Sequence, residues 1–153
     1  MKHQKLWVAA VSVLIALTLA YIWHNSVESI PVSRSRSTEL VEILEPILEP
    51  VVGKGKVTDH FVRKAAHFTE FALLGAELRL LFLLLGFGTV QGHANALFAA
   101  LAAAVVDETI QYFYGRGSMV LDVALDFGGA FFGALVLLLI ALAVRGWRKR
   151  KQG

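Results

Sequence analysis

The sequence predicts an all-α integral membrane protein, a four-helix bundle with a short amphipathic helix in its first extracytoplasmic loop. Three observations favour this fold class: 56% of the 153 residues are hydrophobic, only 18% are charged, and the mean hydropathy is +0.61. This composition is too apolar for a soluble domain of the same length. Each membrane-spanning helix needs about 20 apolar residues, so a single domain of this length has room for four spans.

The first predicted span covers about residues 6–23 and contains no charge. Two lysines precede it, and Tyr21 and Trp23 lie near its end, as in a signal anchor with aromatic residues at the membrane interface. A cleavable signal peptide is the alternative, because Thr18-Leu19-Ala20 resembles a cleavage site. We expect the segment to be retained as an anchor.

Three further apolar segments are predicted to span the membrane, at about residues 65–87, 94–114 and 122–144. Short glycine-containing stretches at 86–92 and 115–118 join them, and such stretches are typical of tight turns. The last three spans are therefore expected to be antiparallel neighbours.

The long loop at about residues 24–64 is predicted to be extracytoplasmic. It begins with the polar stretch Ser33-Arg34-Ser35-Arg36-Ser37, and within residues 38–52 apolar side chains recur at helical spacing opposite four glutamates. This pattern predicts a short helix on the membrane surface or over the bundle, with Pro46 and Pro50 kinking or ending it. The helix is a packing element in the simpler interpretation and a substrate gate in the other.

Basic residues flank the predicted bundle at both ends of the chain. Lys2 and Lys5 precede the first span, and five basic residues lie in the tail at 145–153. Because basic residues favour the cytoplasmic side of spans, both termini are predicted to be cytoplasmic. These clusters also account for the isoelectric point near 9.4, so nucleic-acid binding is not expected. The chain has no cysteine, which excludes disulfides and thiolate metal ligands.

Polar side chains inside the predicted spans gather near one membrane face. Ionisable groups are costly there, so their positions are informative. Seven polar residues from three spans fall in the outer half of the bilayer: His67, Glu70, Asp107, Glu108, Gln111, Asp122 and Asp126. Helical spacing turns them toward a common interior, with Arg63, Lys64 and Arg116 at the rim. Gly129 and Gly133 continue the stripe of Asp122 and Asp126, which predicts a close-packed helix contact.

Three interpretations of this cluster remain open. It is an ion-paired network that holds helices together, a divalent-metal site with His67 and acids as ligands, or a site for a polar headgroup or substrate. In the last case the rim cations meet phosphate and an acid or His67 moves a proton. The candidate catalytic residues are His67, Asp107, Glu108 and Asp122, and the candidate substrate-binding residues are Lys64, Glu70, Gln111, Arg116 and Asp126.

These residues also carry a resemblance to a known family. The stretch Arg63-Lys64-Ala65-Ala66-His67-Phe68-Thr69-Glu70-Phe71 resembles the opening motif of the VanZ-like membrane proteins. Asp107-Glu108-Thr109-Ile110-Gln111-Tyr112-Phe113, followed by Gly115-Arg116-Gly117-Ser118 and Asp122, is similar to the remaining motifs of that family, in the same order. The resemblance covers about residues 62–133. Asp126 departs from it, because many members have asparagine there.

The resemblance implies a small multi-pass protein of the bacterial plasma membrane. The naming member of the family is associated with reduced susceptibility to the glycopeptide teicoplanin, but the resemblance supplies no reaction, substrate or cofactor. We therefore predict a protein that acts at the outer leaflet on or with an envelope lipid or cell-wall component, and that influences glycopeptide susceptibility. The expected partners are the lipid bilayer and an anionic envelope lipid or cell-wall precursor.

Two alternatives come from other functional classes. Buried carboxylates are common in proton- or ion-coupled transport components, and a structural membrane partner without catalysis would need the polar network only for helix packing. The sequence leaves open whether the protein is an enzyme, whether it holds a divalent metal, and which oligomeric state it adopts.

Overall fold

The computed structural model describes residues 2–28, 30–116 and 120–152, and these ranges contain five α-helices and no strand. The helices are α1 (Lys2–Val27), α2 (Ile30–Val52), α3 (Asp59–Leu84), α4 (Thr89–Phe113) and α5 (Val120–Gln152). The predicted all-α class is confirmed. Gly117 and Ser118 of the predicted second turn lie outside the described residues, as do the side chains of residues 30–32, 34, 149 and 152.

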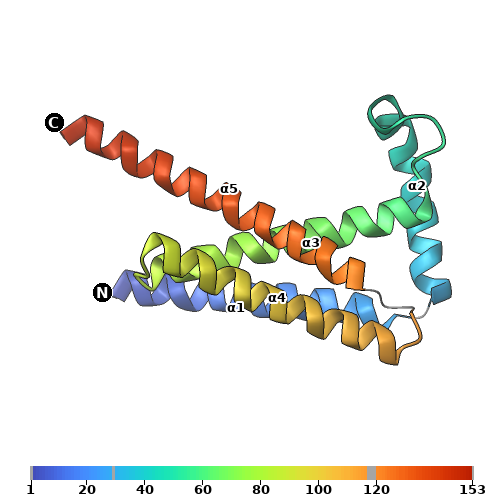
Figure 1. Ribbon diagram of the computed structural model, residues 1–153, viewed down its shortest axis with the longest axis horizontal. Coiled ribbons are helices and arrows are strands. Elements are labelled where there is room, and N and C mark those ends of the chain that lie inside the picture. Colours follow the sequence, from blue (N-terminus) through green and yellow to red (C-terminus); the bar gives the residue numbers. More distant parts are fainter. Residues whose placement is uncertain (1, 29, 117–119, 153) are drawn as a thin grey trace.

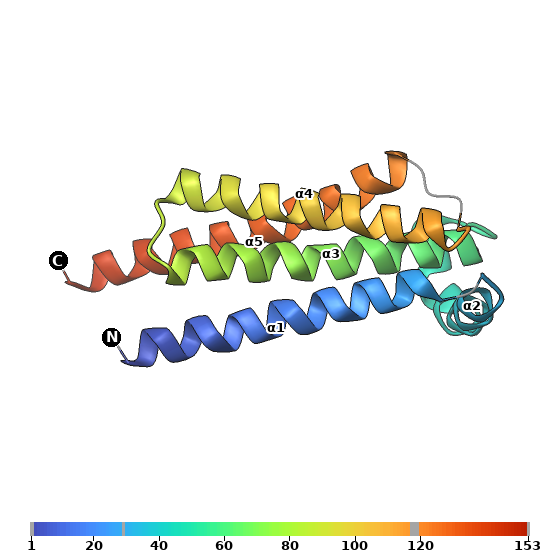
Figure 2. The ribbon, with the colours of Figure 1, turned by 90° about the horizontal axis from the view of Figure 1, so that it is seen from below.

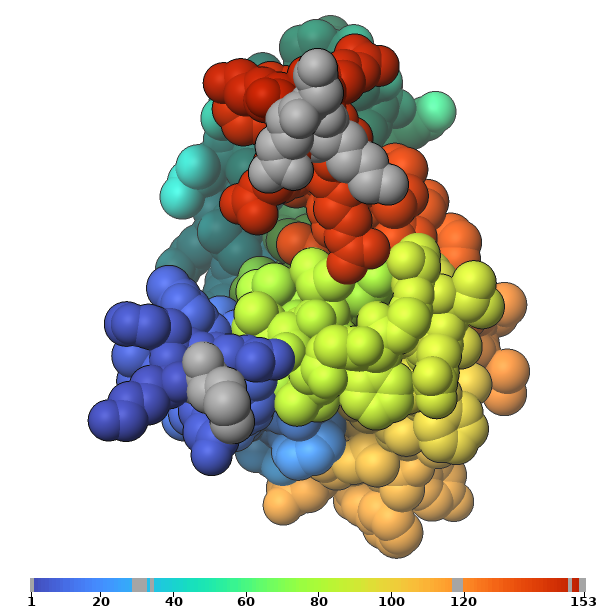
Figure 3. Space-filling model, turned by 90° about the vertical axis from the view of Figure 1, so that its left-hand side faces the viewer, coloured from blue at the N-terminus to red at the C-terminus, as the bar shows by residue number. Residues whose placement is uncertain are grey.

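Four long helices run along the molecule, and α2 lies across one of its ends (Figure 1). Helices α1, α3 and α4 extend side by side, whereas α5 crosses α3 and diverges toward its own C-terminal end (Figures 1 and 2). Both termini lie at the end opposite α2. Figure 3, seen from that end, shows α1 to the left of the turn that joins α3 and α4, and α5 above that turn.

Helix α3 is the central element, because it contacts each of the other four helices. Its Phe71 and Leu74 are fully buried. Helices α1, α4 and the part of α5 from Val120 to Arg148 are long and apolar enough to cross a membrane, which makes three candidate spans among the described residues. Helix α3 carries more charge than they do, and two of its charged side chains, Glu77 and Arg79, are buried in protein. It ends at Leu84, inside the predicted segment 65–87.

The crossing of α3 and α5 depends on glycine. A Cβ atom at Gly129 would overlap the backbone carbonyl of Phe68, and one at Gly133 would overlap that of Ala72. Gly75 of α3 faces the backbone of Ala130 equally closely. The close-packed stripe predicted for α5 is thus confirmed, and it brings the two backbones into direct contact.

Helix α1 presents a regular stripe to its neighbours α3 and α4. Its buried residues are Val11, Ile15, Thr18, Ile22 and Ser26, spaced three or four apart, as expected for one face of a helix. At the N-terminal end Gln4 donates a hydrogen bond of 2.7 Å from Nε2 to the carbonyl of Leu84. The helix continues without interruption through the stretch that resembles a cleavage site.

Helix α2 contains the amphipathic segment predicted at 38–52 but begins earlier, at Ile30, so the polar stretch 33–37 is helical rather than a loop. Contacts outside the segment's own sequence pattern account for the difference: Arg36 pairs with Glu28 at 2.7 Å, and the hydroxyl of Ser37 donates to Asp59 of α3. Pro46 lies inside the helix, which ends at Val52, two residues after Pro50.

Candidate functional site

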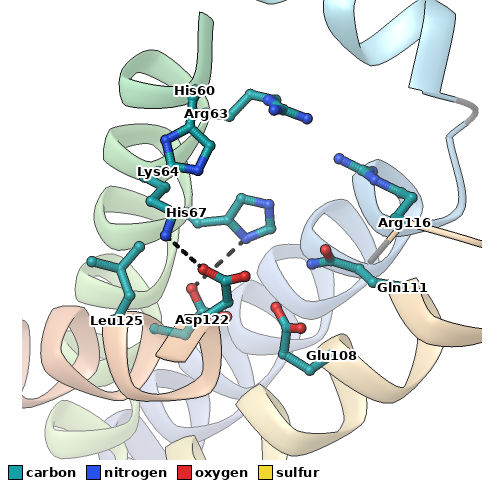
Figure 4. A pocket seen from close by; sticks show the side chains of 10 residues that line it. His60, Arg63, Lys64, His67, Glu108, Gln111, Arg116, Asp122 and Leu125 are labelled. Carbon is teal, nitrogen blue, oxygen red and sulfur yellow. Dashed lines mark ion pairs between the residues drawn. The ribbon is translucent and has the colours of Figure 1, made fainter. Parts of the chain in front are cut away.

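A polar pocket of about 180 Å³ opens at the end of the bundle where α2 lies, between α3, α4 and α5. Its lining side chains come from all three helices and from the turn between α4 and α5 (Figure 4). They are His60, Arg63, Lys64, His67, Glu108, Gln111, Arg116, Asp122, Leu125 and Asp126. Most of the residues predicted to converge therefore do so.

His67, Asp107 and Asp126 form a compact group at the base of this pocket. The Nδ1 atom of His67 lies 3.8 Å from Oδ2 of Asp107 and 3.8 Å from Oδ1 of Asp126. One nitrogen or oxygen atom of each residue lies within 4.8 Å of those of the other two. Asp107 and Asp126 are almost completely buried, and each of the three residues comes from a different helix.

Hydrogen bonds from two helices fix the carboxylate of Asp107. The Ser26 hydroxyl of α1 donates to Oδ1 at 2.5 Å, and Nε2 of Gln111, four residues along α4, donates to Oδ2 at 2.8 Å. Helical spacing predicts the contact with Gln111. Sequence reasoning missed Ser26, because its partner lies 81 residues away along the chain and no pattern in the sequence links the two.

The carboxylate of Asp126 has a different environment. Its side chain is 1% exposed, and within the described residues its Oδ2 atom receives no hydrogen bond. An unsatisfied polar atom in the interior is costly, more so when it belongs to a charged group. Asp126 thus has a buried oxygen at the base of the pocket that no described protein group satisfies.

Basic side chains lie at the mouth of the pocket, as predicted. Nζ of Lys64 pairs with Oδ1 of Asp122 at 2.9 Å. Arg116 donates from Nη1 to the carbonyl of Asn25 at 2.5 Å and from Nη2 to Oγ of Ser33 at 3.2 Å. Burial lowers the pKa of the Arg116 guanidinium, and nearby Arg63 acts in the same direction, but an arginine remains charged at neutral pH. Three basic side chains thus meet at the pocket mouth, where Lys64 is paired with Asp122 and Arg63 with Asp59.

Glu70 lies outside this pocket. It accepts a hydrogen bond of 3.2 Å from Nδ2 of Asn25 and lines an adjacent hollow of about 120 Å³. The hollow shares Arg63, His67 and Arg116 with the main pocket. Of the nine candidate residues, seven line the pocket, Asp107 lies behind its wall within 4.8 Å of His67 and Asp126, and Glu70 lines the adjacent hollow.

An apolar groove of about 370 Å³ continues from that hollow, between α2 and α3. Leu40, Leu44 and Leu48 line it from α2, opposite Ala65 and Ala66 of α3. Because the groove and the hollow share several lining residues, a polar pocket, a hollow with basic and acidic side chains, and an apolar groove follow one another around the N-terminal half of α3. The spacing of the three leucines was a signal for this surface, but the sequence did not show that it faces α3.

Glu77 and Arg79 lie deeper along α3 and do not line the pocket. The hydroxyl of Thr18 in α1 donates a buried hydrogen bond of 3.0 Å to Oε1 of Glu77. Sequence reasoning assigned neither residue a function, and this contact serves helix packing.

The fold and the site define a class: an all-helical protein with membrane-type helices and a polar pocket enclosed among them. The chain belongs to the VanZ/LLP1 family, whose model matches residues 6–141. The match confirms the resemblance and extends it from residues 62–133 to α1, α2 and most of α5. No curated protein and no solved structure matches the chain.

Proposed function

We propose that this VanZ/LLP1 protein spans the bacterial plasma membrane four times and binds the anionic headgroup of an envelope lipid or lipid-linked cell-wall component. Binding takes place at the outer leaflet, in the pocket around His67. The observation that carries the proposal is the continuity of a pocket whose mouth holds three basic side chains with an apolar groove. If the bound molecule is a cell-wall precursor, its sequestration alters glycopeptide susceptibility.

In this proposal α1, α3, α4 and α5 are the spans. The charge of α3 does not prevent this role, because the helix is surrounded by the other three and buries ionisable side chains among them. An even number of spans accords with two termini at one end of the molecule. The basic residues near both termini favour the cytoplasm for that end.

Helix α2 then lies along the outer membrane surface. It runs across the end of the bundle rather than along it (Figure 1). Its apolar Ile43 and Ile47 are exposed, while Leu44 and Leu48 face the groove. A helix with exposed apolar residues that crosses the spans suits the boundary between headgroups and acyl chains.

The pocket mouth suits an anionic phosphate ester. Arg63, Lys64 and Arg116 come together there, and guanidinium and ammonium groups bind phosphate oxygens by charge-assisted hydrogen bonds. Because Arg116 is already held by Asn25 and Ser33, it is positioned before a ligand arrives.

The groove supports a lipid rather than a soluble phosphate. It lies between α2 and α3, beside the hollow that joins it to the pocket, and aliphatic and aromatic side chains line most of it. An acyl or isoprenoid chain there would have apolar contacts while its headgroup reached the basic residues. Acid–base catalysis by His67, Asp107, Glu108 or Asp122 stays a prediction.

Native mass spectrometry of the detergent-purified protein tests this proposal. We expect phosphatidylglycerol to bind at least tenfold more tightly than phosphatidylcholine or free glycerol phosphate. The double variant Lys64→Gln, Arg116→Gln should lose this preference, whereas the control Lys54→Gln, in the exposed loop before α3, should keep it. Leu44→Asn should weaken lipid binding without affecting glycerol phosphate. Unchanged lipid preference in the folded double variant would exclude the pocket as the headgroup site.

A further inference from the structure

The group His67, Asp107 and Asp126 has a geometry that hydrogen bonding does not explain. Both carboxylates face the same nitrogen, Nδ1 of His67, at 3.8 Å. This separation exceeds the range of a hydrogen bond, so neither acid is bonded to the imidazole. Ligand atoms that share a divalent cation, each about 2.0–2.2 Å from it, lie about 3–4 Å from one another. The three side chains thus have nearly the spacing of a ligand set.

The charges of the group also favour a bound cation. Two carboxylates are buried within 4.8 Å of each other, and Glu108 and Asp122 line the pocket above them. Burying like charges without compensation costs several kcal/mol for each ion. Lys64 pairs with Asp122 at the mouth, but the Oδ2 atom of Asp126 has no donor among the described residues. A doubly charged cation at the base would compensate both acids and satisfy Asp126.

The surroundings of Asp107 resemble the outer shell of a metal ligand. Ser26 and Gln111 each donate to one of its oxygens, which fixes the plane of the carboxylate. Such second-shell hydrogen bonds orient ligands in metal sites. The ligands also come from three helices, two of which are locked by the glycine contacts between α3 and α5.

We propose that Nδ1 of His67, Oδ2 of Asp107 and the carboxylate of Asp126 bind one divalent cation. One imidazole and two carboxylates suit Zn²⁺ or Mn²⁺. Three protein ligands leave at least one coordination position for water or a ligand oxygen on the side of the pocket. That a headgroup phosphate takes this position rests on the proposed function, whereas the cation site itself does not.

Metal titration of the full-length protein in detergent tests the site. After treatment with EDTA and its removal, we expect one Mn²⁺ or Zn²⁺ per chain, measured by equilibrium dialysis with elemental analysis. Asp126→Asn preserves the size of the side chain and should weaken binding at least thirtyfold. Glu77→Gln, which neutralises a buried acid outside the pocket, should bind as the wild type does. Thermal melting checks that each variant is folded.

His67→Gln provides a second variant in case Asp126→Asn fails to fold. His67 lies at the pocket wall and is less buried than Asp126, so its replacement should disturb the fold less. It too should weaken binding at least thirtyfold. Binding that persists in the folded variants would overturn the site, since other histidines would then hold the metal, and so would the absence of saturable binding in the wild type. If anionic lipid still binds after EDTA treatment and no saturable metal binding is found, the metal site is overturned and the proposed function stands. A metal site without lipid selectivity would overturn only the proposed function.

Discussion

At the scale of single residues, Asp107 connects three parts of the structure. It receives hydrogen bonds from Ser26 on α1 and Gln111 on α4, and it faces His67 on α3. A buried carboxylate is stable only as far as its partners compensate for lost hydration. The hydroxyl of Ser26 should therefore contribute measurably to the free energy of unfolding.

Ser26→Ala removes this hydroxyl and leaves Oδ1 of Asp107 without its donor. We expect the free energy of unfolding to fall by about 1–3 kcal/mol, because the desolvation cost of the oxygen is no longer offset. Denaturant titration of the protein in detergent, followed by circular dichroism, measures the change. Ser35→Ala, at an exposed position on α2, is the control and should change the value by less than about 0.5 kcal/mol. Equal effects of the two substitutions would contradict the role given to Ser26.

The predictability of the site differs from residue to residue. His67, Asp107, Gln111 and Asp126 could be brought together from sequence because charge inside an apolar segment is rare and helical spacing gives its direction. Ser26 could not, since its partner lies 81 residues away and a serine in an apolar helix gives no electrostatic signal. Glu70 was placed in the common cluster because spacing gives the face of a helix but not which neighbour covers it.

At the scale of the elements, the crossing of α3 and α5 places Asp126 opposite His67. Gly129 and Gly133 permit the two backbones to touch. The register of this contact therefore sets the separation of the two side chains in the pocket.

Gly133→Val tests the crossing, because its side chain would collide with the carbonyl of Ala72. We expect a loss of at least about 2 kcal/mol of stability, since the clash is with rigid backbone rather than with a flexible side chain. Gly146→Val, near the C-terminal end of α5 and with no atom near its Cβ position, should be close to neutral. Thermal unfolding in detergent compares the two. A Gly133→Val protein as stable as the wild type would mean that the helices do not meet as closely as described.

Only part of helix α2 could be predicted from the sequence. Residues 38–52 carry a helical pattern of apolar side chains, so that part was predictable. The stretch 33–37 contains only serine and arginine, which have no apolar periodicity, and its helix is supported by contacts with Glu28 and Asp59. The local sequence pattern does not show such contacts, because they depend on how the chain folds in space.

If α2 lies in the membrane interface, its two faces meet different solvents. A nitroxide attached at Ile43→Cys should be accessible to oxygen, which concentrates in lipid, and one at Glu42→Cys to a water-soluble nickel complex. Both positions are exposed in the isolated chain, so their exposure alone does not produce the difference. Electron paramagnetic resonance of the protein in liposomes measures it. Equal accessibility of both sites to the nickel complex would place α2 in water.

At the scale of the whole molecule, the arrangement of the helices fixes which ends share a side. The termini lie at one end and α2 at the other. The absence of cysteine makes this easy to test, because any introduced thiol is the only one in the chain.

In intact cells, Lys54→Cys should react with a membrane-impermeant maleimide, since the loop after α2 is expected outside. Lys151→Cys, near the C-terminus, should react only after the membrane is permeabilised. Gel-shift detection of the label gives the answer directly. Labelling of both sites in intact cells would contradict the proposed orientation, and the reversed pattern would place the pocket at the cytoplasmic face.

The central position of α3 also governs how the protein is made. Helices α1, α4 and α5 are apolar enough to enter a bilayer one at a time. Inserting α3 alone costs free energy, because Glu70, Glu77 and Arg79 would face lipid until neighbouring helices cover them. Helix α3 should therefore wait at the translocon until α4 and α5 have been synthesised. Membrane insertion of α3 thus depends on the helices that follow it. In a chain released before α5 is complete, we expect α3 to remain outside the bilayer.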